Sequence, residues 1–282
     1  MTASPSRAVL ACSLLLAASG WAADAPLRVS MIPTTDPSRM LRDAEPLVAR
    51  LEKATGRHVT FTIPQSYAAV VEALVQGQVD VAHLGGFTFV QACKRADAVP
   101  LVQRERDRQF HTKFITARDD VRTLADLKGK RFAFGDVNST SGHLMPAYFM
   151  RKEGVDPAVV EEAIYTGGHD ATALAVAERR VDAGALDEAV WERLTSQGRI
   201  DPAKVRVIWT TPPFADYLWV ARKDLDPAVA KKVADAFLAL DPTKPEDRPI
   251  LELLSANGRY VPVDSHEYTA LRKAAEREGL LK

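Results

Sequence analysis

Cysteine is nearly absent from this 282-residue chain, which has only Cys12 and Cys93. Cys12 lies in an N-terminal segment that we expect to be removed, so a single thiol remains. One cysteine can form neither an internal disulfide nor a metal site built from several thiolates. Phe89, Val90 and Ala92 lie close to Cys93 in the sequence. This setting predicts a small buried core residue rather than a reactive thiol.

An excess of charge is also missing, because the chain has 37 Lys+Arg and 37 Asp+Glu. Removal of residues 1–22 would take away Arg7 and no acid, leaving 36 basic against 37 acidic residues and a net charge of −1. Proteins that bind nucleic acid or anionic membranes usually carry a strong basic excess, so we expect neither as a partner. An anionic ligand must therefore be held by local donors.

No apolar run is long enough to cross a membrane, which takes about 20 apolar residues. The apolar stretch at residues 8–19 is much shorter, follows an arginine and is itself followed by the small residues Gly20 and Ala22. These features predict a secretory signal over residues 1–22 and a soluble mature chain in the periplasm. A buried N-terminal helix fits them less well. A lipoprotein cleavage box is disfavoured because Cys12 precedes most of the apolar run.

The remaining chain of about 260 residues is long enough for one large domain or two lobes. Its hydrophobic content of 46% and charged content of 26% are ordinary for a globular protein. Periodicity in its first part predicts three strand–helix pairs. The strands are expected at residues 27–32, 58–63 and 79–84, and the helices at 38–56, 67–76 and 86–95. This alternation is typical of an α/β sheet with helices on its faces.

The pattern then restarts and predicts a second α/β unit. Its strands are expected at residues 110–117, 131–134, 163–165, 181–186 and 205–210. Its helices are expected at 141–153, 170–180 and 189–197, after a helical turn at 124–127. A strand at 217–221 and three helices, at 227–240, at 246–256 and from 265, complete the chain.

We therefore predict a two-lobed α/β fold. Residues 23–116 would form the first part of lobe I, residues 117–211 lobe II, and residues 212–282 would return to lobe I. Two chain crossings, near residues 114–118 and 212–217, would form a hinge over a central cleft. Clefts between lobes are favoured ligand sites.

Three consecutive hydroxyl residues lie between a predicted strand and a predicted helix. They belong to the segment Asn138-Ser139-Thr140-Ser141-Gly142. A helix N-terminus has unpaired N–H groups and the positive end of the helix dipole, so this loop suits a tetrahedral oxyanion. Simple N-capping needs only one hydroxyl, and three favour an anion cradle. No Gly-Lys-Ser/Thr follows, so a nucleotide-hydrolysing loop has no support.

Three further residues gain interest from their places in this fold. His169 follows two glycines just before a predicted helix, where it can donate to an anion. Tyr67 begins a helix after a strand, and its hydroxyl could enter the cleft. Asp216 lies at the second crossing, where it would accept a hydrogen bond from a protonated P–OH group or pair with a ligand ammonium. In isolation each has a plainer explanation: a loop histidine, a packing aromatic and a solvated carboxylate.

The sequence contains no recognisable catalytic or metal-binding motif. There is no Gly-x-Ser-x-Gly nucleophile elbow. No HExxH motif or paired metal spacing occurs among the histidines, which are His58, His83, His111, His143, His169 and His266. We therefore predict a binding protein that is not an enzyme and needs neither metal nor cofactor.

Several ordered segments resemble the periplasmic phosphonate- and phosphite-binding components of ABC importers. The most specific are the Ser-Thr-Ser-Gly loop, Gly168-His169-Asp170, and the Pro-Pro-Phe-Ala-Asp-Tyr segment at residues 212–217. Residues 67–74, 79–85, 124–130 and 182–186 are also similar to this family. The resemblance spans nearly the whole mature chain and implies the type II periplasmic-binding-protein fold. It also implies a small phosphorus oxyanion as ligand and a transporter permease as partner.

The resemblance further implies roles for individual residues. Lobe II would hold the phosphorus oxygens, Tyr67 would close from lobe I, and Asp216 would accept the ligand's proton. The residues expected to hold the oxygens are Ser139, Thr140, Ser141 and His169. Two positions depart from the family pattern. Phe110 replaces a frequent tyrosine, and Asp187, followed by Glu188, replaces a common asparagine. The extra carboxylate could favour a ligand amine or could be a surface or supporting residue, so the choice of ligand stays open.

The leading hypothesis is a monomeric binding protein that delivers its ligand to an ABC importer. The alternative is an exported sensor that signals the same ligand to a membrane histidine kinase. A hydrolase of the same fold is disfavoured, because no activated nucleophile is present.

Overall fold

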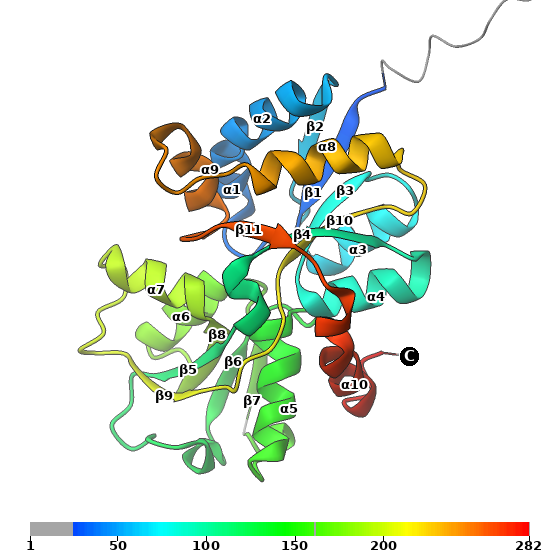
Figure 1. Cartoon of the computed structure of the whole chain (residues 1–282). Helices are drawn as coiled ribbons and strands as arrows, with labels where there is room; N and C mark the ends of the chain where they lie inside the picture. Colours follow the sequence, from blue (N-terminus) through cyan, green and yellow to red (C-terminus); the bar gives the residue numbers. More distant parts are fainter. Residues whose placement is uncertain (1–24, 161, 282) are drawn as a thin grey trace, which may run out of the picture.

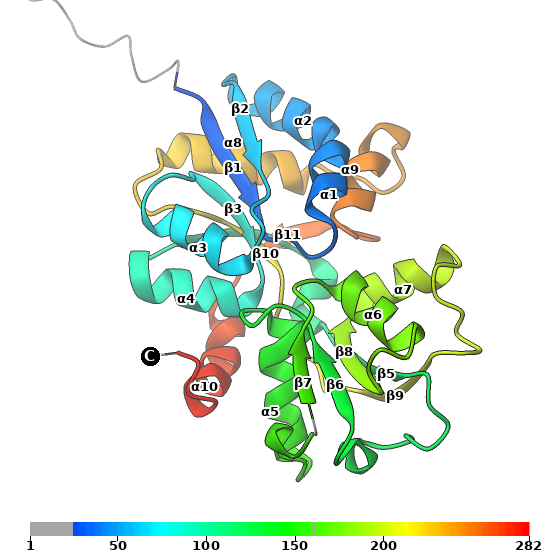
Figure 2. The ribbon, with the colours of Figure 1, turned by 180° about the vertical axis from the view of Figure 1, so that it is seen from behind.

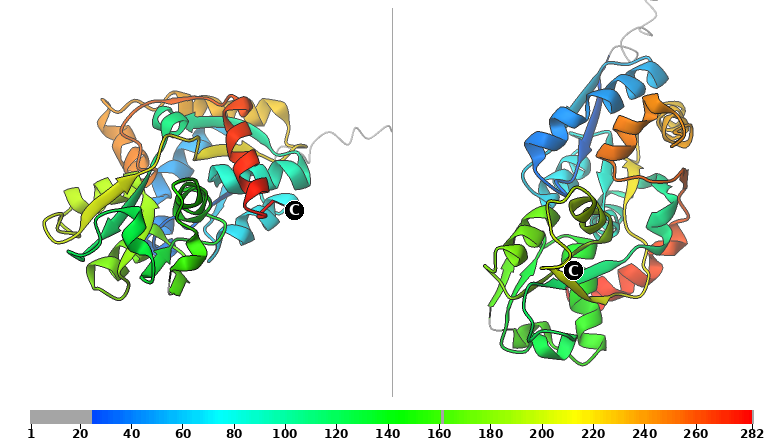
Figure 3. Two further views of the ribbon diagram at one scale, coloured as in Figure 1. Left: turned by 90° about the horizontal axis from the view of Figure 1, so that it is seen from below. Right: turned by 90° about the vertical axis from the view of Figure 1, so that its left-hand side faces the viewer.

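Two separate β-sheets, each flanked by helices, organise the computed structural model of the chain (Figure 1). The structure describes residues 25–160 and 162–281, so the predicted signal at residues 1–22 lies outside the described residues. We call the part around the six-stranded sheet lobe I and the part around the five-stranded sheet lobe II. The lobes are stacked along the long axis of the molecule (Figure 3, right).

The lobe I sheet has the strand order β11-β4-β10-β3-β1-β2. β1 pairs in parallel with β2 and β3, whereas β10 returns antiparallel between β3 and β4. Every residue of β3 is buried, as expected for an apolar strand that is covered on both faces. The strands are β1 (Leu27–Met31), β2 (Val59–Thr62), β3 (Val81–Leu84), β4 (Val99–Arg104), β10 (Leu218–Ala221) and β11 (Tyr260–Pro262).

Helices cover both faces of the lobe I sheet. α2 and α8, with α1 and α9 beside them, pack on one face, and α3, α4 and α10 pack on the other (Figures 1 and 2). The helices are α1 (Pro37–Asp43), α2 (Glu45–Thr55), α3 (Tyr67–Val75), α4 (Gly86–Ala96), α8 (Pro227–Leu238), α9 (Arg248–Leu253) and α10 (Thr269–Arg277). Short 3₁₀ turns are η1 (Glu105–Gln109), η5 (Pro245–Asp247) and η6 (Ser265–Tyr268).

The lobe II sheet has the order β7-β6-β8-β5-β9. α6 and α7 cover one face, and α5 packs on the other. The strands are β5 (Thr112–Thr116), β6 (Arg131–Phe134), β7 (Glu162–Tyr165), β8 (Ala183–Asp187) and β9 (Arg206–Thr210). The helices are α5 (Met145–Lys152), α6 (His169–Ala177) and α7 (Glu188–Ser196), with η2 (Leu124–Leu127), η3 (Thr140–Leu144) and η4 (Pro157–Val159) as short turns.

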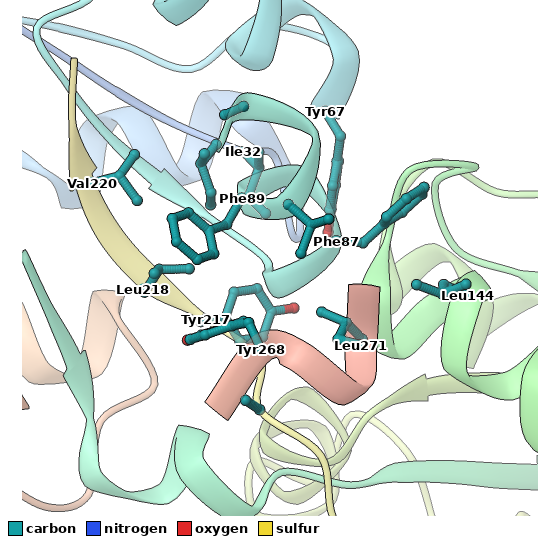
Figure 4. Close-up of a cluster of buried hydrophobic side chains, with 14 of the residues drawn as sticks. Ile32, Tyr67, Phe87, Phe89, Leu144, Tyr217, Leu218, Val220, Tyr268 and Leu271 are labelled. Atoms are coloured by element: carbon teal, nitrogen blue, oxygen red, sulfur yellow. The ribbon is translucent and has the colours of Figure 1, made fainter. Parts of the chain in front are cut away.

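One hydrophobic cluster joins the lobes. It combines lobe I residues such as Phe87 and Tyr67 with Leu144 and Phe149 of lobe II. Figure 4 shows Leu144 approaching Phe87 from the lobe II side. The lobes are therefore in direct contact, which is the closed arrangement of a two-lobed protein.

Cys93 packs at the edge of this cluster and is only half-buried. Burial raises the pKa of its thiol to about 11, and its Sγ lies 3.4 Å from the carbonyl oxygen of Ala98. A thiol in this state carries little thiolate at neutral pH, so it is a poor nucleophile.

The chain crosses between lobes earlier than the sequence predicted. β5 belongs to the lobe II sheet, so the first crossing lies near Phe110 rather than at residues 114–118, and the boundary after residue 116 is wrong. Phe110 and Phe214 form an antiparallel bridge, with N···O distances of 2.8 and 3.0 Å, that ties the two crossings together. The apolar residues of β5 gave no sign of the boundary between the lobes, because strands beside a hinge and strands within a core contain the same residue types.

The helix predicted at residues 38–56 is interrupted. α1 ends at Asp43, and α2 begins at Glu45 with Pro46 in its first turn. Proline has no N–H to donate to the carbonyl group of Arg42, so one continuous helix would lose a hydrogen bond there.

Candidate functional site

The six residues predicted to bind ligand meet where the two lobes touch. Tyr67 comes from α3 of lobe I, and Asp216 lies at the second crossing. The other four belong to lobe II. All six are at most 1% exposed, and they are Tyr67, Ser139, Thr140, Ser141, His169 and Asp216. The structure therefore brings the predicted residues together in one buried region between the lobes.

Helix N-termini from both lobes converge on this region. The N–H groups of Gly86 and Phe87, at the start of α4, lie 3.1 Å from Asp216 Oδ1 and 3.0 Å from Thr140 Oγ1. α3 begins at Tyr67, α6 begins at His169, and the loop ending in Thr140 leads through η3 into α5. Each N-terminus contributes a positive partial charge, so the region can attract an anion although no Lys or Arg is among the six residues.

The hydroxyl loop is shaped by a proline. Pro146 lies in the first turn of α5 and cannot donate to the carbonyl oxygen of Gly142, which instead accepts from Gly135 N at 2.8 Å. The preceding residues 140–144 form a π-type turn, a conformation often found at functional sites. A Cβ atom at position 142 would lie 2.9 Å from Ser139 Oγ and 3.0 Å from His169 Cε1. Only glycine therefore fits at position 142 without displacing these side chains.

The three hydroxyl groups differ in their partners. Ser139 Oγ accepts from Gly142 N at 3.0 Å, so it caps the helix and keeps its own proton for a further bond. Thr140 Oγ1 accepts from Phe87 N of the opposite lobe. Ser141 Oγ is buried and has no hydrogen-bond partner within residues 25–160 and 162–281. A buried hydroxyl without a partner is costly, so Ser141 is well suited to a bound oxygen atom.

The surroundings of His169 fix which ring nitrogen carries the proton. Its Nδ1 accepts from Asp187 N at 3.3 Å, so in the neutral ring the proton lies on Nε2. Burial lowers the pKa of His169, which favours this neutral form. Nε2 faces the hydroxyl groups of Tyr67 at 3.5 Å and Tyr217 at 3.1 Å. His169 therefore presents a donor to the inter-lobe region.

Asp216 combines full burial with an incompletely satisfied carboxyl group. Its Oδ1 accepts from Gly86 N, whereas Oδ2 has no partner within the described part of the chain. Burial raises the pKa of Asp216 to about 7, and the carboxylates of Asp187 and Asp107 add to the rise. The Gly86 N–H group and the Thr140 hydroxyl act in the opposite direction. Near neutral pH this carboxyl group can therefore either hold or accept a proton.

Phe110 and Asp187, the two positions that depart from the family pattern, and the neighbouring Glu188 all have structural partners. Phe110 is fully buried and packs edge-on against Tyr217, with ring centroids 5.6 Å apart. Asp187 Oδ1 accepts from Val190 N at 2.9 Å and thereby caps α7. Glu188 accepts from His111 N at 3.2 Å and lies 3.6 and 3.7 Å from cationic side chains, those of Arg106 and Lys113.

Tyr217 also lies in this region, although its sequence context did not mark it as a site residue. Its ring is stacked on His83 with centroids 5.5 Å apart and an interplanar angle of 7°, and Figure 4 shows it among the inter-lobe side chains. Burial raises its pKa well above the ordinary value, so it remains a neutral phenol that can donate or accept. Its position directly after Asp216 was the available signal. Which way its ring points depends on tertiary packing.

The match with known proteins decides the family. A family model described as "ABC transporter, phosphonate, periplasmic substrate-binding protein" matches residues 29–268. The chain belongs to this family. It is therefore a periplasmic substrate-binding protein of a phosphonate-type ABC transporter, and not an enzyme, as the sequence predicted.

Similar proteins share most of the chain. A probable ABC transporter phosphite binding protein of Prochlorococcus marinus is 28% identical over 89% of this chain and 89% of its own. A phosphate-import protein of Mycolicibacterium smegmatis is 32% identical over 80% of this chain and 79% of its own. The structure of PhnD1 from Prochlorococcus marinus in complex with methylphosphonate has a TM-score of 0.85 at 28% identity, covering 90% of this chain and 98% of that one.

These comparisons confirm the fold class. The chain has the two-lobed α/β fold of type II periplasmic binding proteins. Among the described residues, no helix is both long and apolar enough to cross a membrane. No cluster of three or more potential metal-ligating side chains occurs in the described ranges either.

Proposed function

We propose that this protein captures a small phosphorus oxyanion between its lobes. Ser139, Thr140, Ser141 and His169 would donate to the phosphorus oxygens from lobe II, and Tyr67 would donate from lobe I. The observation that carries the proposal is the meeting of helix N-termini and buried hydroxyl groups from both lobes, one of which, Ser141 Oγ, lacks a partner within the described residues. Such donors bind an anion strongly because no water competes with them.

Asp216 gives this site a preference for ligands that can share a proton. A phosphonate, phosphite or phosphate monoanion carries a P–OH group that can donate to the carboxylate. Sulfate carries no proton at neutral pH, so a charged Asp216 would repel it. Burial raises the pKa of Asp216 to about 7, so near neutral pH one proton is available to be shared between Asp216 and the ligand. Relatives are named for phosphite, phosphate and methylphosphonate, which all fit this description.

We further propose that the protein acts as a monomer with an ABC permease as its partner and binds no nucleic acid. Cleavage after residue 22 would release it into the periplasm. With the earlier crossing, lobe I would comprise residues 23–110 and 212–282, and lobe II the residues between them. The signalling alternative receives no support from the family or its relatives.

Thr140→Ala and His169→Ala test the site directly. We expect each to weaken binding of methylphosphonate and phosphite by about tenfold or more, because each removes a donor from a dry site. Isothermal titration calorimetry measures the affinities, and phosphate, hypophosphite, 2-aminoethylphosphonate and sulfate complete the panel. His266→Ala is the matched control, because that side chain is exposed to solvent, and we expect unchanged binding.

Folding must be checked separately, since both variants alter buried residues. Thermal unfolding without ligand should still be cooperative. Added ligand should raise the melting temperature of the wild type by mass action, and should raise that of the variants less. Titration curves that coincide with the wild type for both variants would refute the site.

A further inference from the structure

Asp216 is held by its main chain from two directions. Its N–H group donates to the carbonyl oxygen of Asp107 at 2.9 Å, and its own carbonyl oxygen lies 2.9 Å from the hydroxyl of Tyr268. Tyr268 in turn lies 2.9 Å from Gln103 Oε1. Asp107 belongs to η1, immediately before the first crossing, whereas Asp216 lies in the second crossing. The carboxyl group of Asp216 is thus held by these main-chain contacts as well as by the hydrogen bond that Oδ1 accepts from Gly86 N.

A buried ion pair fixes the turn that carries Asp107. Arg104 donates to the Asp107 carboxylate through Nε at 2.7 Å and Nη2 at 2.5 Å, and the two side chains are 5% and 1% exposed. The Arg104 N–H group also donates to Asp107 Oδ2 at 3.1 Å. Nη1 of Arg104 donates to the carbonyl oxygens of Leu254 and Ser255 at 2.8 and 3.0 Å. The pair therefore leaves η1 little freedom to move.

The same guanidinium group packs against aromatic rings of both crossings. Arg104 Cζ lies 5.5 Å from the ring centroid of Phe110 and 5.1 Å from that of Tyr217. Tyr217 is the residue whose hydroxyl faces His169 of lobe II. One ion pair consequently touches both chain crossings and supports both Asp216 and its neighbour.

Stability alone gives little reason for such a pair. Burying two charges costs several kcal/mol per ion, and well-packed apolar residues often replace a buried ion pair without loss of stability. A bidentate arginine–carboxylate pair does, however, fix geometry, because both groups are planar and their hydrogen bonds are directional.

We propose that Arg104 and Asp107 are positioning residues for ligand binding, which hold Asp216 and Tyr217 where lobe II meets them on closure. The inference rests on the proposed function of Asp216. Neither residue needs to touch the ligand. Their effect on affinity would come through the orientation of Asp216 and Tyr217 and through the electric field at the Asp216 carboxyl group.

The electric field at the Asp216 carboxyl group is set by the charged and titratable groups around it. Asp107 faces it from η1 and Asp187 from the start of α7, and both raise its pKa. The phenols of Tyr67, Tyr217 and Tyr268 lie close and stay neutral, since burial raises the pKa of each. Arg104 lies behind Asp107. His83 lies behind Tyr217 and stays uncharged, because burial lowers its pKa to about 3.

The test uses Asp107→Asn, the double variant Arg104→Gln/Asp107→Asn, and Tyr268→Phe. Asp107→Asn removes a negative charge near Asp216, so we expect the Asp216 titration midpoint to fall by about one pH unit. In the double variant both charges of the pair disappear, and the midpoint should return toward the wild-type value. Tyr268→Phe changes no charge and should leave the midpoint in place. The midpoint is read from the ¹³C resonance of the Asp216 carboxyl carbon in ligand-free protein, assigned with Asp216→Asn.

Binding of methylphosphonate should be about tenfold weaker in all three variants. Each variant weakens the contacts that hold the main chain of Asp216 in place. The double variant separates geometry from charge, since it restores the charge balance but not the bidentate pair. It also leaves no unpaired buried charge, so it should stay folded if Asp107→Asn does not. An Asp216 midpoint that is unchanged in Asp107→Asn, together with affinities within about twofold of wild type, would overturn the proposal.

Failure of the proposed function would look different. In that case wild-type protein would bind neither methylphosphonate nor phosphite. The ligand-free titration of Asp216 would still report whether the ion pair controls that carboxyl group.

Discussion

At the scale of single residues, the unusual feature is a carboxylic acid within the proposed anion site. Asp216 is fully buried, and Asp107 and Asp187 lie close enough to raise its pKa. Carboxylates would normally exclude an oxyanion by repulsion, and here the helix N-termini and hydroxyl groups offset that effect. In the proposed function, the carboxyl group would select among ligands, because the complex needs one proton shared between Asp216 and the ligand.

This arrangement predicts how stability depends on pH. The pKa of Asp216 rises from 3.8 to about 7 on folding, so the folded protein binds a proton that the unfolded chain has lost. The resulting stabilisation is fully present below pH 3.8 and is lost as the pH rises through about 7. Relative to Asp216→Asn, the wild type should lose at most ~4 kcal/mol across this range, at 1.36 kcal/mol per pKa unit.

Urea unfolding of the two ligand-free proteins, from about pH 4 to about pH 8, measures this difference. Titrating groups that do not interact with Asp216 affect both proteins alike and cancel in the comparison. Parallel stability curves for wild type and variant would show that Asp216 titrates normally in the folded protein.

At the scale of elements, the site depends on how closely a loop of one lobe approaches a helix of the other. Gly85 precedes α4, and a Cβ atom at this position would lie 2.9 Å from Thr140 Oγ1 and 3.3 Å from Asp216 Oδ1. The backbone of Gly85 is extended, with φ −79° and ψ 162°, which any residue can adopt. Glycine is therefore required here for space between the lobes rather than for backbone conformation.

Gly85→Ala should accordingly separate folding from closure. We expect normal thermal unfolding of the ligand-free protein but about tenfold or greater loss of methylphosphonate affinity, because the methyl group would hold Thr140 away from α4. Gly258→Ala is the control, since a Cβ atom there meets nothing within 4 Å. Equal affinity of Gly85→Ala and wild type would mean that the lobes bind ligand without this close approach.

At the scale of the whole molecule, contacts away from the site also hold the lobes together. Arg151 of α5 donates to Glu278, just after α10, at 2.9 Å, and the Glu278 side chain is only 5% exposed. α5 belongs to lobe II, whereas α10 packs on α4 of lobe I. Arg151 also pairs with Asp156 within lobe II. One arginine therefore has one partner that links the lobes, Glu278, and one that does not, Asp156.

Glu278→Gln and Asp156→Asn exploit that difference. Removing the inter-lobe partner should favour the open form and weaken methylphosphonate binding by a few fold, as expected for a pair worth about 1 kcal/mol or less. The Asp156 variant should bind like the wild type. Calorimetry gives the affinities, and small-angle X-ray scattering gives the radius of gyration with and without ligand. Identical behaviour of the two variants would remove this pair from the closing mechanism.

Local sequence signals predicted most elements but missed strands β4 and β11 of lobe I. β4 contains Pro100 and ends in polar Gln103 and Arg104, so it does not resemble a core strand. Its pairing with β10 is irregular between Trp219 and Val220, and a proline is tolerated near such an irregularity. β11 is only three residues long and contains a proline, so its pattern is too short to read. Both strands form because the tertiary structure provides neighbouring strands to pair with, which their own residues do not predict.

Local sequence patterns were enough to predict the α/β alternation and the hydroxyl loop before a helix. These depend on residues within one or two turns of each other, where periodicity and capping act. The tertiary structure, by contrast, set the tautomer of His169 through Asp187 N and turned Tyr217 toward His169. It also decided where the hinge lies. These properties arise from contacts between segments far apart in the chain, which no local pattern encodes.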